Sequence, residues 1–209
     1  MTAPGGPVPL ASYDEALKAA LKMLPRRTQG AFAAACAERL YPAYAAYAQR
    51  SGLDDEGLVR RALDLAWAWA KTGVIEDPDP SDLVERCAGL IPGIDAENAI
   101  PAYADDAIAS AAYALQAAAG LDDAAAGWAA QRGTDSLDDF LLSDEIDISV
   151  PGAERRVWEH PLTSAEISRR DQDLRRLNGS SDWDVAVDAV RADATGVSAL
   201  PLDRLDREA

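Results

Sequence analysis

The stretch CAERLYPAYAAYAQRSG holds the residues of this chain that look most able to do chemistry. Glu38 and Arg39 form an adjacent acid–base pair, and Tyr41, Pro42 and Tyr44 follow in a run that is otherwise mostly alanine. A carboxylate, a guanidinium and phenols can serve in acid–base catalysis, so the stretch could be an active-site signature. It could equally be a joint in a helical scaffold, because a proline bends a helix and tyrosines fill the gap that a bend leaves. The rest of the sequence favours the joint.

Nucleophilic and histidine-dependent catalysis lack most of the groups that they need. The chain has no phosphate-binding loop, no dinucleotide glycine fingerprint, no H-E-x-x-H motif and no G-x-S-x-G motif. His160 is the only histidine, and its place in E-H-P at a predicted helix end is typical of a surface or capping residue. Cys36 stands among alanines without a base nearby in sequence, which indicates a small buried hydrophobic residue. The sequence therefore predicts no catalytic residue and no enzyme.

Metal and cofactor binding are not predicted either. Carboxylates are plentiful and could hold Mg²⁺ or Ca²⁺, but no segment has the residue spacing of an EF-hand loop. The Glu-x-x-His pairs of di-iron helical bundles are also absent from the sequence. We expect no metal and no cofactor.

Some charged residues fall on predicted helices at positions where burial would require a partner. Asp64 lies between two leucines in ALDLAWAWA, and Asp106 shares a face of its predicted helix with Ser110. A buried carboxylate needs an opposite charge, which Arg39, or else Arg60 or Arg61, could supply. We predict a buried polar lock between helices, with Arg39 paired to Asp64 or Asp106. Its members are Glu38, Arg39, Asp64 and Asp106.

The net charge of −16 is concentrated in the middle of the chain. Residues 72–154 contain 18 acidic residues and only two basic ones, whereas the two flanking segments together are neutral. Six acids near the end of this segment follow one another with no intervening Lys or Arg. Such a block steers a basic surface toward itself, although a merely solvated acidic face is equally compatible with the pattern. The predicted partner-binding residues are Asp135, Asp138, Asp139, Asp144, Glu145 and Asp147.

Charge and hydropathy also indicate which partners to exclude. An acidic chain with a sequence pI near 4.3 repels nucleic acid and anionic membranes. The longest uncharged apolar stretch, residues 107–121, is shorter than the roughly 20 residues that span a bilayer. Two cysteines in 209 residues do not make a disulfide framework, so we expect a cytoplasmic protein.

The elements that must position these residues are predicted to be helices. Alanine-rich segments with helical periodicity are separated by Pro and Gly stop signals, and no convincing alternating strand is present. We expect an all-α fold, a single bundle-like domain of about seven to nine helices without a significant sheet. The domain would span residues 12–196, between a disordered tail (1–11) and an irregular C-terminal tail (197–209). The predicted helices lie near residues 12–24, 28–51, 54–71, 80–90, 99–120, 121–142, 155–159, 164–177 and 181–194.

Two sequence motifs resemble a bacterial helical family without an assigned activity, the YjaG-like domain-of-unknown-function family 416. The run AERLYPAY at residues 37–44 is similar to that family's C-E-R-[LM]-Y-P-N-Y run, and RALDLAW at residues 61–67 is similar to its R-x-L-D-L-x-W. Weaker similarities lie around Asp106, at residues 168–171 and at residues 196–198. The resemblance implies a single all-helical domain and carries over no catalytic residue.

Three functions fit these observations. The first is a non-enzymatic acidic interaction protein, most concretely an immunity or inhibitor protein that neutralises a basic toxin domain through the acidic middle segment. The second is a helical enzyme or small-molecule-binding protein with a pocket near Glu38, Asp64, Asp106 and the tyrosines. The third is a homo-oligomeric scaffold joined through an alanine-rich face. We favour the first, and the oligomeric state is open.

Overall fold

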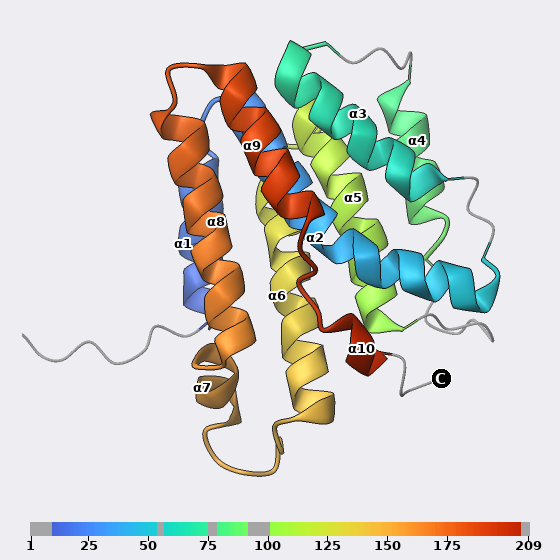
Figure 1. Cartoon of the computed structure of the whole chain (residues 1–209), viewed down its shortest axis with the longest axis vertical. Helices are drawn as coiled ribbons and strands as arrows, with labels where there is room; N and C mark the ends of the chain where they lie inside the picture. Colours follow the sequence, from blue (N-terminus) through green and yellow to red (C-terminus); the bar gives the residue numbers. More distant parts are fainter. Residues whose placement is uncertain (1–9, 54–56, 75–78, 92–100, 206–209) are drawn as a thin grey trace, which may run out of the picture.

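The computed structural model describes residues 10–53, 57–74, 79–91 and 101–205, and within them helices are the only regular secondary structure, with no strand. This confirms the predicted all-α fold, and the nine predicted helices correspond to α1–α9 (Figure 1). The helices are α1 (Leu10–Leu21), α2 (Arg26–Ser51), α3 (Leu58–Thr72), α4 (Pro80–Ala88), α5 (Ala102–Ala119), α6 (Ala125–Asp144), α7 (Ala153–Trp158), α8 (Pro161–Gly179), α9 (Trp183–Thr195) and α10 (Leu202–Leu205).

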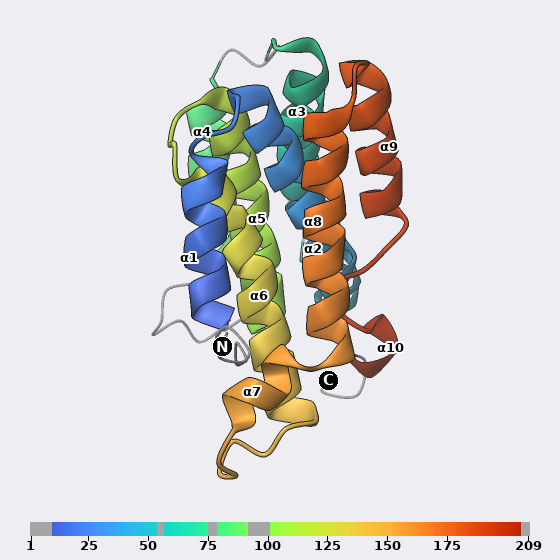
Figure 2. The same cartoon turned by 90° about the vertical axis from the view of Figure 1, so that its left-hand side faces the viewer.

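The helices α2 and α5 form the centre of the bundle. α5 packs against α2, α3, α4 and α6, and α2 also contacts α8 and α9. In Figure 1, α8 and α9 lie on one side of α2, while α3 and α4 lie on the other. α7 and the loop before it extend from the lower end of the molecule, as Figure 2 also shows. The described part of the acidic middle segment, residues 72–154, includes α4 and α5 as well as α6, which leads to this end of the molecule.

Small residues let the central helices approach one another closely. A Cβ atom at Gly30 on α2 would lie 3.1 Å from the Cα of Ala118 on α5, and 3.0 Å from the ring of Trp69 on α3. Many of the alanines of α2 and α5 are fully buried, so the backbones pack almost directly against each other. A few large side chains fill the remaining space, among them Phe32, Leu40, Leu63, Trp67, Ile108 and Leu115.

Several predicted helix ends are confirmed. α2 and α3 stop at Gly52 and Gly73, whose φ angles of 67° and 75° lie in the left-handed region that favours glycine. α4 begins with Pro80 behind Asp79, whose carboxylate accepts hydrogen bonds from the next free backbone N–H groups. The acids predicted to open the third helix, residues 54–56, lie outside the described residues.

The start of α1 differs from the prediction. The helix begins at Leu10, so Ser12 is inside it and does not cap it. Glu15 pairs instead with Lys18, one turn further on, at 2.9 Å. Most of the predicted N-terminal tail, residues 1–9, lies outside the described residues.

α2 continues through Pro42 but bends in its middle (Figure 1). Proline has no N–H group to donate to the carbonyl of Glu38, four residues earlier. The neighbouring carbonyl of Arg39 accepts a hydrogen bond from the backbone N–H of Ala199, with an N···O distance of 2.8 Å. The joint that the sequence predicts is therefore also where the C-terminal segment attaches.

This attachment corrects the prediction of an irregular tail from residue 197. The segment carries the short helix α10, and Leu200 and Leu205 are buried against Ala43 and Leu137. This segment is too short to show a helical periodicity, and the partner carbonyl on α2 leaves no signal in the sequence. Residues 206–209 lie outside the described part of the chain. None of the helices that the structure describes is both long and apolar enough to cross a membrane.

Candidate functional site

Arg39 lies in a buried ionic cluster between α2 and α8. Its side chain is 2% exposed, and its Nε donates to both carboxylate oxygens of Glu166 at 3.1 Å. Its Nη1 donates to Oδ2 of Asp173 at 2.7 Å. The predicted pairing of Arg39 with Asp64 or Asp106 is therefore wrong, because α8 supplies both of its carboxylates.

Arg170 joins this cluster to α1 and α6. Its Nε donates to Glu166 at 3.1 Å, its Nη1 to the hydroxyl of Thr134 at 2.9 Å, and its Nη2 to the carbonyl of Ala130 at 2.8 Å. Asp14 on α1 lies 3.7 Å from Arg170 and accepts a hydrogen bond from Thr134. One ionic cluster thus holds four helices together. Its charged members are Asp14, Arg39, Glu166, Arg170 and Asp173.

Sequence reasoning missed the α8 half of the ionic cluster. Glu166, Arg170 and Asp173 are spaced i, i+4 and i+7, which places them on one face of a helix. All three are buried, so this polar stripe was the available signal. Gly133 on α6 was a second signal, since a Cβ atom there would lie 2.9 Å from Nη2 of Arg170.

The electrostatics of the ionic cluster indicate a structural role. Burial alone would raise the pKa of Glu166, but the guanidinium groups of Arg39 and Arg170 hold it below its usual value. Burial raises the pKa of the Cys36 thiol to about 11, although Arg39 lies beside it. Cys36 is therefore protonated at neutral pH and a poor nucleophile, in agreement with its predicted role as a small buried residue.

Glu38 forms a second cluster, between α2 and α3. Its carboxylate accepts two hydrogen bonds from Arg60, at 2.7 and 2.9 Å, and one from the indole N–H of Trp67 at 3.0 Å. The guanidinium of Arg60 also lies over the ring of Tyr41, 4.9 Å from its centroid. Every carboxylate oxygen of Glu38 is therefore occupied by a protein donor.

Asp64 lies at the surface and not in a buried lock. Its side chain is 51% exposed, and it accepts hydrogen bonds from Arg60 at 3.0 Å and from Arg191 of α9 at 2.8 Å. Its neighbours Leu63 and Leu65 suggested burial, but Asp64 is on the outer side of α3. Its hydrogen bond with Arg191 connects α3 to α9 at the surface of the molecule.

Asp106 is buried in a third cluster, between α5 and α6. It accepts hydrogen bonds from the hydroxyl of Ser136 at 2.8 Å and from Arg132 at 3.1 Å. Burial raises the pKa of Asp106 to about 6, against the effects of Ser136 and Arg132. The four residues of the predicted lock thus lie in three different clusters. Glu38, Arg39 and Asp106 are buried, whereas Asp64 is exposed.

The six acids predicted to bind a partner lie along the outer part of α6 and the loop that follows it. Asp135 pairs with Arg132 at 3.2 Å on the same helix. Asp144 and Glu145 both face Arg204 of α10. These three acids are therefore at least partly neutralised.

Asp138 and Asp139 have no ion pair with any residue in the described ranges. Burial and the carboxylates of Asp139, Asp135 and Glu154 all raise the pKa of Asp138. Burial and Asp135 raise the pKa of Asp139, with Arg132 opposing them. We call Asp135, Asp138 and Asp139 the acidic stripe, since their spacing puts them on one side of α6.

His160 confirms its prediction as a capping residue. It is the N-cap of α8, and its Nδ1 accepts a hydrogen bond from the backbone N–H of Leu162 at 3.2 Å. Its Nε2 lies 3.0 Å from Glu145. The only imidazole of the chain is thus used to hold the loop before α8.

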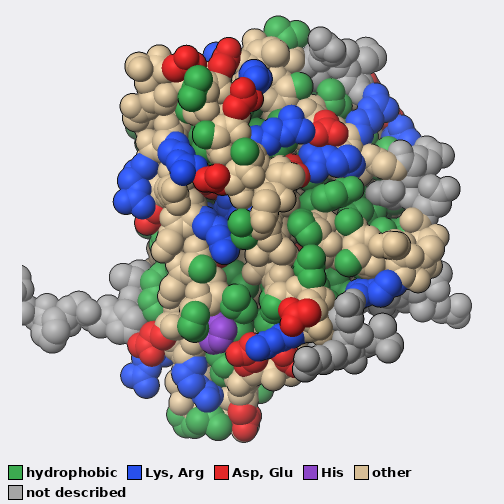
Figure 3. All heavy atoms as spheres, in the orientation of Figure 1, with side chains coloured by type: hydrophobic (Ala, Val, Ile, Leu, Met, Phe, Trp, Pro, Cys, Tyr) green, Lys and Arg blue, Asp and Glu red, His purple; other side chains and the backbone are tan. Residues whose placement is uncertain are grey.

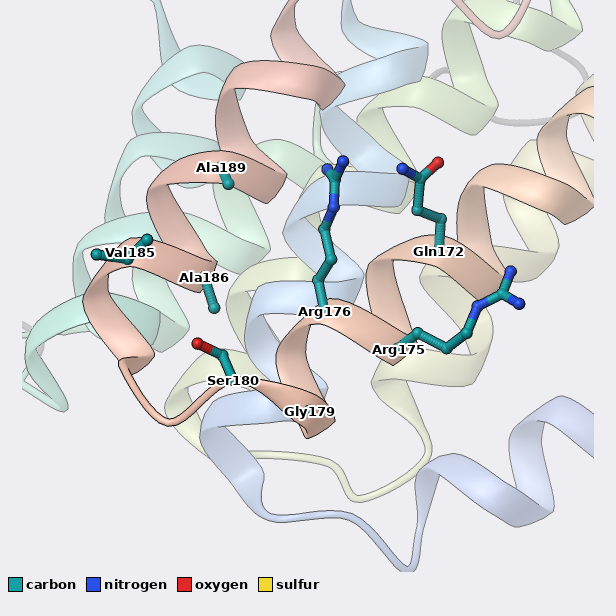
Figure 4. A pocket seen from close by; sticks show the side chains of 8 residues that line it. All are labelled: Gln172, Arg175, Arg176, Gly179, Ser180, Val185, Ala186 and Ala189. Atoms are coloured by element: carbon teal, nitrogen blue, oxygen red, sulfur yellow. The ribbon is translucent and has the colours of Figure 1, made fainter.

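A shallow groove of about 490 Å³ lies between α8 and α9 (Figure 4). Val185, Ala186 and Ala189 form one wall, and Gln172 and Arg176 stand on the other. It does not include Glu38, Asp64 or Asp106, so it is separate from the pocket proposed from the sequence. Among the described residues, no group of three or more His, Cys, Asp or Glu is arranged to hold a metal ion.

The model of a protein family of unknown function, DUF416, matches residues 16–200. The chain belongs to the DUF416 family. The crystal structure of a DUF416 family protein from Shewanella baltica OS155 is similar to this fold, with a TM-score of 0.74 and 19% sequence identity over 87% of this chain and 95% of that chain. None of the curated proteins matches the chain.

The residues that carry the DUF416 resemblance are concentrated in the clusters between helices. Glu38 and Arg39, from AERLYPAY, each anchor a different cluster, and Trp67, from RALDLAW, donates to Glu38. Arg170 belongs to the weaker match at 168–171, and residues 196–198 lead directly to the attachment on Arg39. In this DUF416 protein the recognisable motifs therefore build the scaffold.

Proposed function

We propose that this DUF416 protein is a non-enzymatic binding protein that captures a basic protein through its acidic stripe. Most concretely, it is an immunity or inhibitor protein that binds and neutralises a basic toxin domain in the cytoplasm. It uses no metal or cofactor and binds neither nucleic acid nor membrane, as its acidity favours.

One observation carries this proposal: Asp138 and Asp139 are crowded by other carboxylates and form no ion pair with a described residue, although Arg132 lowers the pKa of Asp139. Lys or Arg side chains of a partner would relieve that repulsion on binding. Complementary charge also accelerates association, which an inhibitor of a toxic protein needs.

The alternatives have different supports. The groove between α8 and α9 favours a small-molecule-binding protein, because its volume is within the ~300–1,000 Å³ range of ligand pockets. The third candidate is a homo-oligomeric scaffold joined through an alanine-rich face. The alanine-rich faces of α2 and α5 are buried inside the bundle, so such a scaffold would have to join through another surface.

Affinity capture with the whole chain from its native host, at low and high salt, is the first test. A basic protein should be retained at low salt and released at high salt, because exposed charges are screened. The recovered protein is then produced separately and its binding kinetics are measured.

The decisive variant is the double substitution Asp138→Asn/Asp139→Asn. Its matched control is Asp171→Asn/Asp184→Asn, which removes two exposed acids from α8 and α9 with the same change in net charge. We expect the stripe variant to associate about tenfold more slowly and with a weaker salt dependence, and the control to stay within about twofold of wild type. Equal association rates for the two double variants would rule the stripe out.

A further inference from the structure

The loop between α6 and α7 exposes two large aliphatic side chains. Ile148 is 73% exposed and Val150 is 43% exposed, whereas Ile146 is buried beside Leu141 and Val157. This loop, residues 145–152, is called the tip loop below, and it forms the lower end of the molecule in Figures 1 and 2. In Figure 3, apolar side chains are present at that end, with both acidic and basic ones beside them. Adjacent exposed apolar residues bordered by charge are typical of protein contacts.

Internal hydrogen bonds hold the tip loop in one conformation. Oδ1 of Asp147 accepts from the backbone N–H of Ser149 at 2.8 Å and from its hydroxyl at 2.6 Å. The carbonyl of Asp147 accepts from the N–H of Val150 at 3.2 Å and from Arg156 at 2.9 Å. A loop that is already ordered loses less conformational entropy when a partner binds it.

The tip loop is continuous with the acidic stripe. Glu154, at the start of α7, is close enough to Asp138 to raise its pKa, so the two sides of the loop share one electrostatic field. Residues 135–156 contain seven acids and two bases, and Arg132 and Arg204 from outside this segment pair with three of the acids. The other four acids outnumber the two bases, so the surface beside the tip loop keeps a negative balance. A surface that matches this arrangement has an apolar pocket with Lys and Arg around it.

We propose that Ile148 and Val150 are the apolar anchors of the interface, and that they enter an apolar pocket rimmed by Lys and Arg on the basic partner. This inference rests on the proposed function, and it adds the residues that keep the complex together. The acidic stripe governs the rate of encounter, whereas the anchors govern the lifetime of the complex.

The test uses the whole chain and the basic protein recovered by the capture experiment. Ile148→Ser/Val150→Ser removes both anchors without adding charge. Its matched control is Met23→Ser/Val185→Ser, at two other exposed positions, of which Met23 is 85% exposed. We expect the anchor variant to dissociate about 30-fold or more faster with an unchanged association rate, and the control to match wild type within about twofold.

A second pair of variants tests the ordering of the loop. Asp147→Asn keeps an oxygen that accepts from Ser149 but removes the charge, whereas Asp147→Ala removes both. We expect Asp147→Ala to weaken binding about tenfold while Ile148 and Val150 are still present, and Asp147→Asn to restore most of that loss.

The outcomes separate this inference from the proposed function. If the anchor variant binds like wild type while Asp138→Asn/Asp139→Asn associates slowly, the anchors are overturned and the proposed function stands. If the anchor variant loses binding but neither salt nor the stripe variant has an effect, charge-driven capture is overturned, and the basic rim with it. If no basic protein is captured, both fail together.

Discussion

At the scale of residues, Glu166 is the carboxylate on which two buried arginines depend. It accepts hydrogen bonds from both Arg39 and Arg170, and all three side chains are buried. Glu166→Gln would leave these guanidinium groups inside the protein with one negative charge fewer. Because breaking a buried ionic group by removing one partner is costly, we expect a loss of about 3–5 kcal/mol in the free energy of unfolding, measured by urea denaturation.

The matched control for this substitution is Glu159→Gln, at an exposed position next to α7. It should change the free energy of unfolding by less than about 0.5 kcal/mol. A loss of similar size in both variants would mean that Glu166 contributes no more than a surface acid does.

Asp106 predicts a pH dependence of stability with a defined sign. Its pKa is about 6 in the folded protein and 3.8 in an unfolded chain, so the folded state binds this proton more tightly. The resulting stabilisation is fully present below pH 3.8 and is lost as the pH rises through about 6. Asp106→Asn has no such proton to lose.

The stability of wild type relative to Asp106→Asn should therefore fall by about 2 kcal/mol between pH 4.5 and pH 7.5. Urea denaturation of both proteins at several pH values gives this difference. A difference between wild type and Asp106→Asn that is constant across this pH range would contradict the raised pKa.

At the scale of elements, the C-terminal segment holds the bend of α2 through one backbone hydrogen bond and two buried leucines. Leu200 is 2% exposed and Leu202, two residues later, is 37% exposed. Leu200→Ala should lower the free energy of unfolding by about 2–4 kcal/mol, because it leaves a cavity beside Ala43 and Leu137. Hydrogen exchange at the amide of Ala199 should accelerate in parallel.

Leu202→Ala is the matched control, since it removes the same atoms from a more exposed position. We expect it to cost less than about 1 kcal/mol. If both substitutions destabilise the protein equally, the segment is not docked as the structure describes.

The elements themselves were largely predictable from the sequence, because their signals are local. Gly52, Gly73 and the Asp79-Pro80 pair mark helix ends by backbone conformation and capping, which depend on neighbours only. α10 was not predicted, because the segment that carries it is held by a distant carbonyl on α2. Ser12 was misread as a cap because the helix begins two residues earlier, at Leu10.

At the scale of the whole molecule, the sequence predicted which residues are polar and buried better than it predicted their partners. Glu38, Arg39 and Asp106 stood out by their places on apolar helices, but pairing depends on how the helices cross. Arg39 lies near Asp64 in the chain and yet meets Glu166 and Asp173. Asp64 shows the reverse error, since its position between leucines does not say which side of α3 faces solvent.

The net charge of a segment is the same before and after folding, so the sequence predicts it. Which individual acids form ion pairs depends on the fold, and the sequence does not predict it. Asp144 and Glu145 are engaged by Arg204, a residue far along the chain that no local pattern could connect to them. Asp138 and Asp139 form no ion pair with a described residue. The interaction surface that we propose is therefore narrower than the acidic block suggested.

The distance along the chain between Arg39 and its carboxylates has a consequence for synthesis. Glu166 and Asp173 follow Arg39 by 127 and 134 residues, and both are added long after α2 has left the ribosome. Until then a guanidinium destined for the interior must stay in water, so α2 cannot settle into the core while the chain is still growing through α6. The nascent chain therefore completes this part of its fold only after α8 has been made, and until then its alanine-rich helices are accessible to chaperones.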